Sequence, residues 1–231
     1  MATTSLGLAI TLGRTTVSPT EIIANCRAIA EATDLPVNAD LENCGADEPK
    51  AAAGMIRIAA DAGMVGGSIE DASGDAAHPI YDFALAVERV QAAVEVARSL
   101  PFPFMLTARA ENFVNGRADF DDTIKRLQAF EAVGADVLFA PGLKDLATIK
   151  AVVSAVTKPV NVVMSHADPA ITAADLAVIG VKRVSVGGSM ARYAMAAFLK
   201  AGREMKDEGR FTFVQDAASS KALKAAFAAA G

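Results

Sequence analysis

Short runs of apolar and β-branched residues alternate along this chain with longer alanine-rich segments, in which apolar residues recur at helical spacing. The short runs predict seven strands, at residues 6–12, 36–41, 65–70, 103–108, 136–140, 160–164 and 183–186. The longer segments predict helices at residues 18–33, 48–62, 81–99, 120–133, 143–156 and 170–179. Strands that alternate with helices indicate an α/β protein with a parallel sheet that is covered by helices on its outer side.

Capping and turn residues mark several of the predicted boundaries. Ser18 places a capping hydroxyl before Pro19, and Glu21 follows three residues after the cap. Gly134 and Gly180 come after predicted helices, where glycine commonly ends a helix. No low-complexity linker divides the chain, so residues 1–231 are expected to form a single domain.

The number of strands bears on how the sheet closes. Seven predicted strands are one fewer than a closed barrel of eight parallel strands needs, and the first predicted strand begins close to residue 1. Either an N-terminal βα unit is absent from the chain, or the barrel closes in another way. An open, doubly wound sheet is the structural alternative.

Polar residues follow several predicted strands, at the edge where parallel α/β folds bind their ligands. Because side chains alternate along a strand, Asn38 and Asp40 share one face, and Glu70 ends the neighbouring strand. Carboxylates of this kind, completed by water molecules, suit an octahedral Mg²⁺ site. Arg109 ends the next strand and is placed to bind a substrate carboxylate beside the metal.

Residues of this kind also have purely structural interpretations. Acids that follow strands often cap helices or face solvent. The turn formed by Gly187, Gly188 and Ser189 is either a phosphate-binding turn at a helix N-terminus or simply a tight turn. Cys44 has no histidine near it in the sequence, and a loop thiol without a base is commonly inert. His166 follows a strand and either donates to a ligand or lies on the surface.

Composition narrows the functional classes. Hydrophobic residues make up 52% of the chain and charged residues 21%, which is enough for a sizeable core. No apolar run approaches the ~20 residues that span a bilayer, and the first residues lack a signal-peptide pattern. The net charge of −5 argues against nucleic acid as a partner. The two cysteines suit a reducing cytoplasm, and the two histidines exclude a site of several histidines, so oxygen ligands and therefore Mg²⁺ or Mn²⁺ are expected.

Five segments resemble motifs of the isocitrate lyase/phosphoenolpyruvate mutase superfamily, in the order that the family has them and over nearly the whole chain. They are TTSLGL at residues 3–8, PVNADLENCG at 36–45, SIED at 68–71, ARAENFVNG at 108–116 and VSVGGSMAR at 184–192. The likeness is greatest to short members of the superfamily that carry stretches similar to VNADLENG and IEDATGD.

The resemblance implies a TIM barrel that binds Mg²⁺ and a small 2-oxo carboxylic acid or its enolate. Metal binding is then expected from Asp40, Glu70, Asn38 and Glu42. Substrate binding is expected from Thr4, Ser5, Leu6, Arg109 and Asn161, and catalysis from Arg109, Glu70 and Thr4. Members of the superfamily are commonly tetramers that exchange a C-terminal helix, so a homo-oligomer, either a dimer or a tetramer, is expected. The alanine-rich tail at residues 217–230 is the candidate for the exchanged helix.

Four departures from the family pattern limit what the resemblance carries over. Asn38 and Thr16 stand where members have aspartates, and the neutral Asn38 leaves the metal site one charge short unless Glu42 compensates. The loop at residues 71–81 lacks both the Lys-Lys/Arg-Cys-Gly motif of the isocitrate lyases and the lysine of the mutase, so cleavage of isocitrate or methylisocitrate is not expected. The fourth departure is the expected absence of the first βα unit, which in family members precedes the Thr-Thr-Ser loop.

The sequence therefore predicts a Mg²⁺-dependent lyase or hydrolase in the cytoplasm. It would break a carbon–carbon or carbon–phosphorus bond of a small 2-oxo acid through an enolate-like intermediate, as oxaloacetate decarboxylases do. The alternative is a catalytically impaired homologue that binds a carboxylate metabolite without turning it over. A third interpretation, a phosphosugar-binding barrel, would use the turn at residues 187–189 and would not need Asp40.

Overall fold

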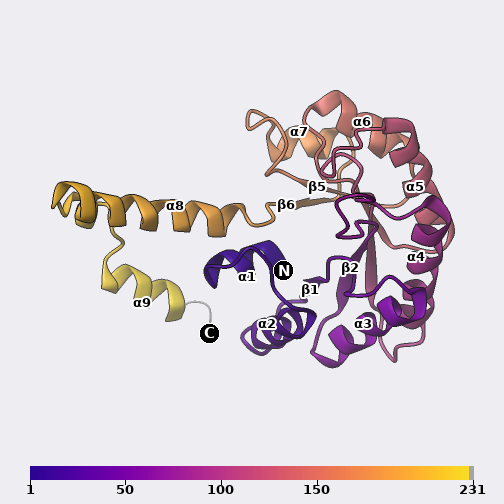
Figure 1. The fold of residues 1–231 in the computed structure, drawn as a ribbon, viewed down its shortest axis with the longest axis horizontal. Coiled ribbons are helices and arrows are strands. Elements are labelled where there is room, and N and C mark those ends of the chain that lie inside the picture. Colours follow the sequence, from indigo (N-terminus) through magenta and orange to yellow (C-terminus); the bar gives the residue numbers. More distant parts are fainter. Residues whose placement is uncertain (229–231) are drawn as a thin grey trace.

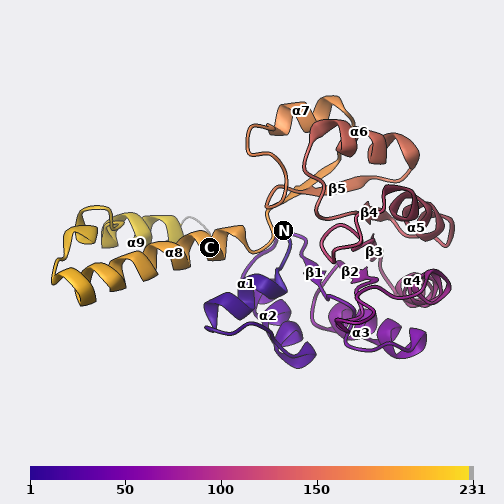
Figure 2. The same cartoon turned by 45° about the horizontal axis from the view of Figure 1, so that its top comes forward.

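A curled parallel sheet of six strands organises the fold. The computed structural model describes residues 1–228, and in it neighbouring strands pair in the order β1-β2-β3-β4-β5-β6. The strands are β1 (Asn38–Asp40), β2 (Gly66–Glu70), β3 (Met105–Arg109), β4 (Val137–Phe139), β5 (Val160–Val163) and β6 (Arg183–Ser185). The sheet forms an arc with helices around its convex side, so the described chain is a half-barrel (Figures 1 and 2).

Helices cover the convex side of the sheet and bury its apolar residues. They are α2 (Pro19–Glu31), α3 (Pro49–Asp61), α4 (Phe83–Arg98), α5 (Phe120–Ala132), α6 (Leu146–Ala155) and α7 (Ala173–Val178). Ile69, Leu106 and Leu138, which alternate with concave-side residues along β2 to β4, are fully buried against these helices. Burial of apolar surface is the main stabilising term. The concave side is thereby left for polar side chains.

The predicted α/β pattern and several predicted boundaries are confirmed. Each of the six predicted helices contains one of α2 to α7, and the last six predicted strands coincide with β1 to β6, of which β3 runs one residue past its predicted end, to Arg109. Ser18 caps α2 in a full capping box with Glu21. Gly134 and Gly180 have φ angles of 106° and 95°, a conformation that glycine adopts without strain, and they follow the ends of α5 and α7.

The strand predicted at residues 6–12 is wrong, because this segment forms helix α1 (Ser5–Thr11). Its start is fixed by Thr4, whose side chain accepts a hydrogen bond from the backbone N–H of Gly7. A short apolar run does not distinguish a strand from a buried helix by its pattern alone. Strand-like pairing occurs a few residues earlier, where Ala2 forms a parallel bridge with Asn38 of β1.

The six described strands form part of a barrel, as a TIM-barrel type of fold with fewer than eight strands requires, and they do not close it within residues 1–228. The predicted absence of a first βα unit stays a prediction. Within the same residues, no helix combines the length and the apolar character needed to cross a bilayer.

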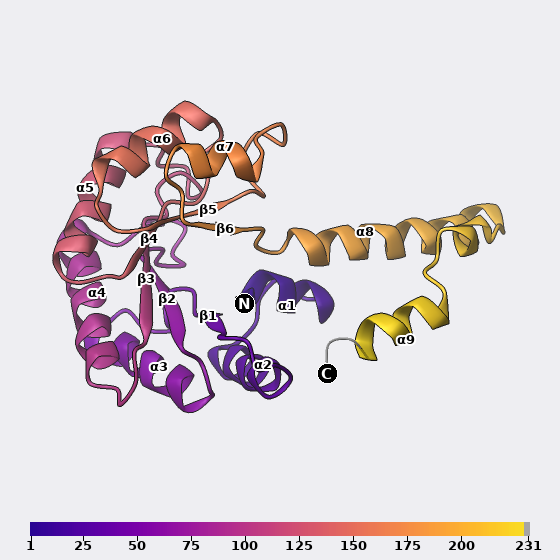
Figure 3. The same ribbon diagram turned by 180° about the vertical axis from the view of Figure 1, so that it is seen from behind.

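The C-terminal segment leaves the half-barrel. Helix α8 (Ser189–Arg203) extends away from the sheet and continues into a π-helical turn (Glu204–Glu208), a 3-10 turn (Thr212–Gln215) and helix α9 (Ser220–Ala228) (Figures 1 and 3). Neither α8 nor α9 contains a buried residue. The tail predicted to be helical at residues 217–230 contains α9, and its residues 229 and 230 lie outside the described residues.

Candidate functional site

A group of charged side chains lies at the carboxyl ends of β1, β2 and β3 on the concave side of the half-barrel. Glu70 pairs directly with Arg109 in the β2–β3 register, and Arg109 pairs with Phe139 of β4. Asp40 is the last residue of β1. Because these residues have the same parity along their strands, their side chains share one face of the sheet.

Arg109 is the centre of this group. Its Nη1 lies 2.9 Å from Oδ1 of Asp40, its Nη2 3.0 Å from Oε2 of Glu70, and its Nε 2.8 Å from Oε1 of Glu111. The guanidinium also lies over the ring of Phe139, 5.1 Å from its centroid. Only 16% of the Arg109 side chain is exposed, so these ion pairs are shielded from solvent. The structure brings together Asp40, Glu70 and Arg109, which alternation along the strands places on one face.

The N-terminal segment holds Asp40 from the other side. The backbone N–H of Ser5 donates to Oδ2 of Asp40 at 2.9 Å, and the Ser5 hydroxyl donates to the Asp40 carbonyl at 2.8 Å. The hydroxyl of Thr3 accepts a hydrogen bond from the Asp40 backbone N–H. Both carboxylate oxygens of Asp40 therefore have partners, one on Arg109 and one on Ser5.

Burial and neighbouring charges shift the pKa values of the side chains in this cluster. Burial raises the pKa of Glu70 to about 8, and the nearby carboxylates of Glu111, Asp40 and Glu42 add to the rise, whereas Arg109 opposes it. Burial, with the Asp40 charge, also raises the pKa of Glu42. Burial disfavours the charged form of Arg109, but its three carboxylate partners outweigh this and raise the pKa of the guanidinium. Negative charge at the site thus exceeds what Arg109 neutralises.

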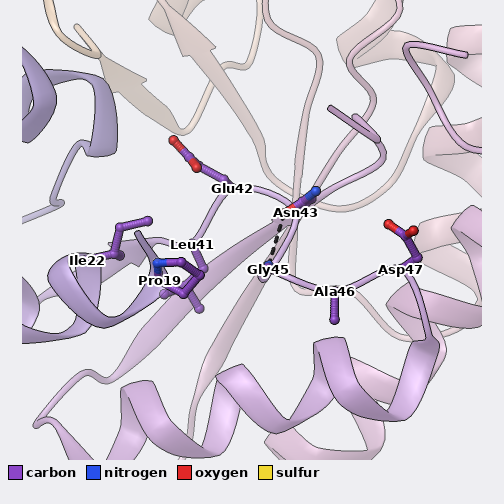
Figure 4. A pocket seen from close by; sticks show the side chains of 8 residues that line it. All are labelled: Pro19, Ile22, Leu41, Glu42, Asn43, Gly45, Ala46 and Asp47. Atoms are coloured by element: carbon purple, nitrogen blue, oxygen red, sulfur yellow. Dashed lines mark hydrogen bonds between the residues drawn. The ribbon is translucent and has the colours of Figure 1, made fainter. Parts of the chain in front are cut away.

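Glu42 lies on the loop that follows β1. Its backbone has a φ of 51°, and Cys44 in the same loop has a φ of 61°, both in the left-handed region that non-glycine residues seldom adopt. The loop lines a cavity of about 390 Å³. Glu42 and Asp47, which both line this cavity, lie at opposite ends of the loop (Figure 4). The hydrogen bond from the Gly45 N–H to the Asn43 side chain holds the turn between them (Figure 4).

Asp40, Glu70 and Glu42 have the oxygen donors of a Mg²⁺ site, although the first two are paired with Arg109. Within residues 1–228, no group of three or more histidine, cysteine, aspartate or glutamate side chains lies close enough to hold a metal ion. Carboxylate oxygens are nevertheless the ligands that Mg²⁺ prefers, and a cation would offset both the burial of Glu70 and Glu42 and the smaller effect of the neighbouring carboxylates on their pKa values. The oxygen donors of Asp40, Glu70 and Glu42 therefore suit a divalent cation in kind, although they are not assembled around one point within residues 1–228.

The other predicted metal ligand, Asn38, lies deeper on the same face than Asp40. Its side-chain nitrogen occupies the space beside Gly66 of β2, where a Cβ atom would approach it to 2.5 Å. Gly66 thus makes room for the Asn38 amide. The Asn38 amide nitrogen therefore lies against β2.

Two further predicted substrate-binding residues surround the start of α1. Thr4 caps this helix, and its hydroxyl is therefore already an acceptor for the Gly7 N–H. Leu6 is about half exposed and contacts the turn before α8, where a Cβ atom on Gly188 would lie 3.0 Å from the Leu6 side chain. This close approach favours the tight-turn interpretation of Gly188.

Three residues to which the sequence assigns no role, Glu111, Asp71 and Arg126, complete the buried charge network. Glu111 bonds Arg109, and its backbone N–H donates to Oδ1 of Asp71 at 2.7 Å. Oδ2 of Asp71 pairs with Nη1 of Arg126 from α5 at 3.0 Å. Burial raises the pKa of Asp71 to about 6 against the opposing effects of the Glu111 N–H and Arg126. The signal for Glu111 is its position two residues after Arg109, on the same face.

Asn161, the remaining predicted substrate-binding residue, lies across the concave side on β5. It is buried, its side-chain oxygen accepts from Nε of Arg183 at 2.9 Å, and its side-chain nitrogen donates to the Ser185 hydroxyl at 3.0 Å. Both polar atoms of the Asn161 side chain therefore bond residues of β6.

The two side chains that had alternative interpretations are not brought into this group. Cys44 is buried, and burial raises the pKa of its thiol to about 12, so it remains a protonated thiol at neutral pH. His166 is exposed on the loop after β5.

Comparison with known proteins places this geometry in a family. The family model described as phosphoenolpyruvate phosphomutase matches residues 1–206. A crystal structure from Burkholderia cenocepacia, provisionally described as a lyase/mutase, is 50% identical to the chain with a TM-score of 0.95, and the match covers 99% of this chain and 82% of that one. A structure of phosphonopyruvate hydrolase in complex with oxalate and Mg²⁺ shares the fold at 21% identity, with a TM-score of 0.82, over 96% of this chain and 80% of that one.

Curated relatives match a smaller part of their own length. An uncharacterized protein of Mycobacterium tuberculosis is 31% identical over 172 residues, which is 74% of this chain and 62% of that protein. Oxaloacetate decarboxylase of Bradyrhizobium diazoefficiens is 30% identical over 151 residues, 63% of this chain and 51% of the enzyme. The chain therefore spans between about half and three fifths of these relatives. With the family match over residues 1–206, these likenesses show that the chain belongs to the phosphoenolpyruvate mutase/isocitrate lyase superfamily.

Proposed function

We propose that the protein is a Mg²⁺-dependent lyase or hydrolase that acts on a small 2-oxo carboxylic acid through an enolate-like intermediate. The observation that carries the proposal is the position of Arg109 at the strand ends, with Asp40 and Glu70 on either side of its guanidinium. One centre thus combines an anion-binding cation with carboxylates that fit a divalent metal. The oxaloacetate decarboxylase and the oxalate complex of phosphonopyruvate hydrolase among the similar proteins support this substrate class.

Each residue of the site has a role in the proposal. Asp40 and Glu70, with Glu42 from the loop after β1, would hold the metal, which supplies a Lewis acid for an oxygen of the substrate. Arg109 binds the substrate carboxylate through its paired N–H groups. The N-terminal segment closes the site beside Asp40, where the Ser5 N–H is already directed at a carboxylate oxygen.

The experiment is a steady-state assay with oxaloacetate and related 2-oxo acids, with and without Mg²⁺. Asp40→Asn and Arg109→Gln should each lower kcat/KM by on the order of 100-fold or more, because each removes a charged group from the reacting centre. Arg98→Gln is the matched control, since Arg98 pairs with Asp136 near the opposite end of the sheet and is 48% exposed. The proposal fails if turnover does not depend on Mg²⁺ or if all three variants behave as the wild type.

A second candidate is a homologue that binds a carboxylate metabolite without turning it over. It is favoured by the finding that no three metal-binding side chains are assembled within the part of the chain described here. Calorimetry with oxalate and Mg²⁺ separates the two functions. Binding without turnover of any 2-oxo acid would support the second candidate and exclude the first.

We also propose that the chain forms a homo-oligomer through α8. Met190, Tyr193 and Phe198 of this helix are each at least 70% exposed, and the helix extends away from the sheet, past α1 (Figure 1). A surface of large apolar side chains along one helix is costly in water and is typical of a protein interface. A second copy that covers α8, as in superfamily members that exchange a C-terminal helix, would bury this surface.

A further inference from the structure

A second arginine lies on the concave face of the half-barrel, across the sheet from Arg109. Arg183 is the first residue of β6 and pairs in register with Asn161 of β5, which in turn pairs with Phe139, the neighbour of Arg109. Its Nη2 reaches across to the hydroxyl of Thr107, at 3.0 Å. Since Thr107 precedes Arg109 by two residues on β3, the two guanidinium groups belong to the same face.

The partners of Arg183 differ in kind from those of Arg109. Arg109 has three carboxylates, whereas Arg183 has the side-chain oxygens of Asn161 and Thr107, which are neutral. No carboxylate among residues 1–228 lies within 4.0 Å of its guanidinium. Its Nη1 has no hydrogen-bond partner in the same part of the chain. A half-buried guanidinium with its full charge is thus left without a counter-ion.

The neutral partners hold Arg183 in place without satisfying its charge. Asn161 is fixed by its own bond to Ser185, so Nε and Nη2 of Arg183 are anchored on two sides. Burial and the positive charge of Arg109 both act to lower the pKa of Arg183. An anion bound between the two guanidinium groups would offset both effects. An oriented arginine with a free N–H edge is the arrangement that binds a carboxylate or a phosphonate.

We infer that Arg183 is a second substrate-binding residue, which with Arg109 selects a substrate that carries two anionic groups. The inference rests on the proposed function, because it takes Arg109 as the site of the first carboxylate. It narrows the substrate class to 2-oxo acids with a second carboxylate or a phosphonate, and it disfavours monocarboxylates such as pyruvate. Asn161 then orients Arg183 through its hydrogen bond with Nε.

The test compares two ligands that differ by one carboxylate. Malate and lactate are 2-hydroxy acids of this kind, and their affinities for the full chain are measured by calorimetry with Mg²⁺. The wild type should bind malate at least 10-fold more tightly than lactate, as expected for one charge-assisted hydrogen-bonded contact. Arg183→Gln should lose roughly 10- to 100-fold in malate affinity and keep its lactate affinity. Arg183→Lys, which keeps the charge, should recover part of the preference.

The matched control is Lys182→Gln, which removes one positive charge from the next residue, on the opposite face and exposed. It should leave the preference for malate unchanged. Oxalate binding distinguishes a failure of the inference about Arg183 from a failure of the proposed function. If oxalate binds with Mg²⁺ but wild type and Arg183→Gln discriminate malate from lactate equally, the inference about Arg183 is wrong and the proposed function stands. If oxalate does not bind either, both are wrong.

Discussion

Replacement of Arg126 by methionine would leave a buried carboxylate without its counter-charge. Only 6% of the Arg126 side chain and 1% of the Asp71 side chain are exposed, and their Nη1 and Oδ2 atoms are 3.0 Å apart. Arg126 also donates from Nε to Asp122 at 2.7 Å and from Nη1 to the Tyr81 carbonyl. Methionine keeps much of the volume but supplies none of these bonds.

The magnitude follows from this burial. Breaking a buried ion pair by removing one partner costs about 3–5 kcal/mol, because the remaining charge is uncompensated. The free energy of unfolding of Arg126→Met, measured in urea, should fall by about this amount. Arg98→Met is the control, since its pair with Asp136 is 48% exposed on the arginine side and should contribute at most about 1 kcal/mol.

A second variant separates the effect of the lost charge on the free energy of unfolding from the effect of lost packing. In Asp71→Asn/Arg126→Met no carboxylate is left at position 71, so the double variant should be more stable than Arg126→Met alone. Asparagine can still accept the hydrogen bond from the backbone N–H of Glu111. A loss below about 1 kcal/mol for Arg126→Met, or a double variant no more stable than the single one, would refute the reasoning.

Three further predictions concern other parts of the fold. Gly66→Ala should lower the free energy of unfolding by about 1–3 kcal/mol, because the new Cβ would approach Asn38 Nδ2 to 2.5 Å; an unchanged urea midpoint would contradict this. Hydrogen bonds from Ser18 lower the pKa of Glu21 from 4.5 to about 2, so its ionised form stabilises the fold above pH 4.5 and this is lost as the pH falls towards 2. The difference in unfolding midpoint between wild type and Glu21→Gln should therefore shrink over that range, and a constant difference would disprove it. Phe198→Asp should reduce the assembled mass in analytical ultracentrifugation, whereas an unaltered sedimentation coefficient would argue against an interface on α8.

Local patterns in the sequence predict most of the helices and strands, and they fail where the pattern is short. Alternation along β1 to β3 places Asp40, Glu70 and Arg109 on one face, since strand-end position and side-chain parity are both local properties. The segment at residues 6–12 is misassigned because its helix depends on one capping bond from Thr4.

Residues whose role depends on strand register are less predictable from the sequence. Arg183 meets Thr107, which lies 76 residues earlier in the chain, only because four strands are curled into an arc. Nothing in the sequence near Arg183 indicates that its partners are neutral. The Arg126–Asp71 pair likewise joins a helix to a strand end 55 residues away. Such long-range pairs depend on how the strands and helices pack in the folded chain, which no local pattern specifies.

The three ion pairs of Arg109 have a consequence for how ligands would bind together. A cation that binds Asp40 and Glu70 competes with the guanidinium for the same carboxylates and so releases its N–H groups. An anion that binds the guanidinium releases the carboxylates in return. Cation and anion should therefore bind with positive cooperativity, and by thermodynamic linkage each should raise the affinity for the other by the same factor. Calorimetric titrations of Mg²⁺ with and without oxalate, and of oxalate with and without Mg²⁺, would measure that factor twice.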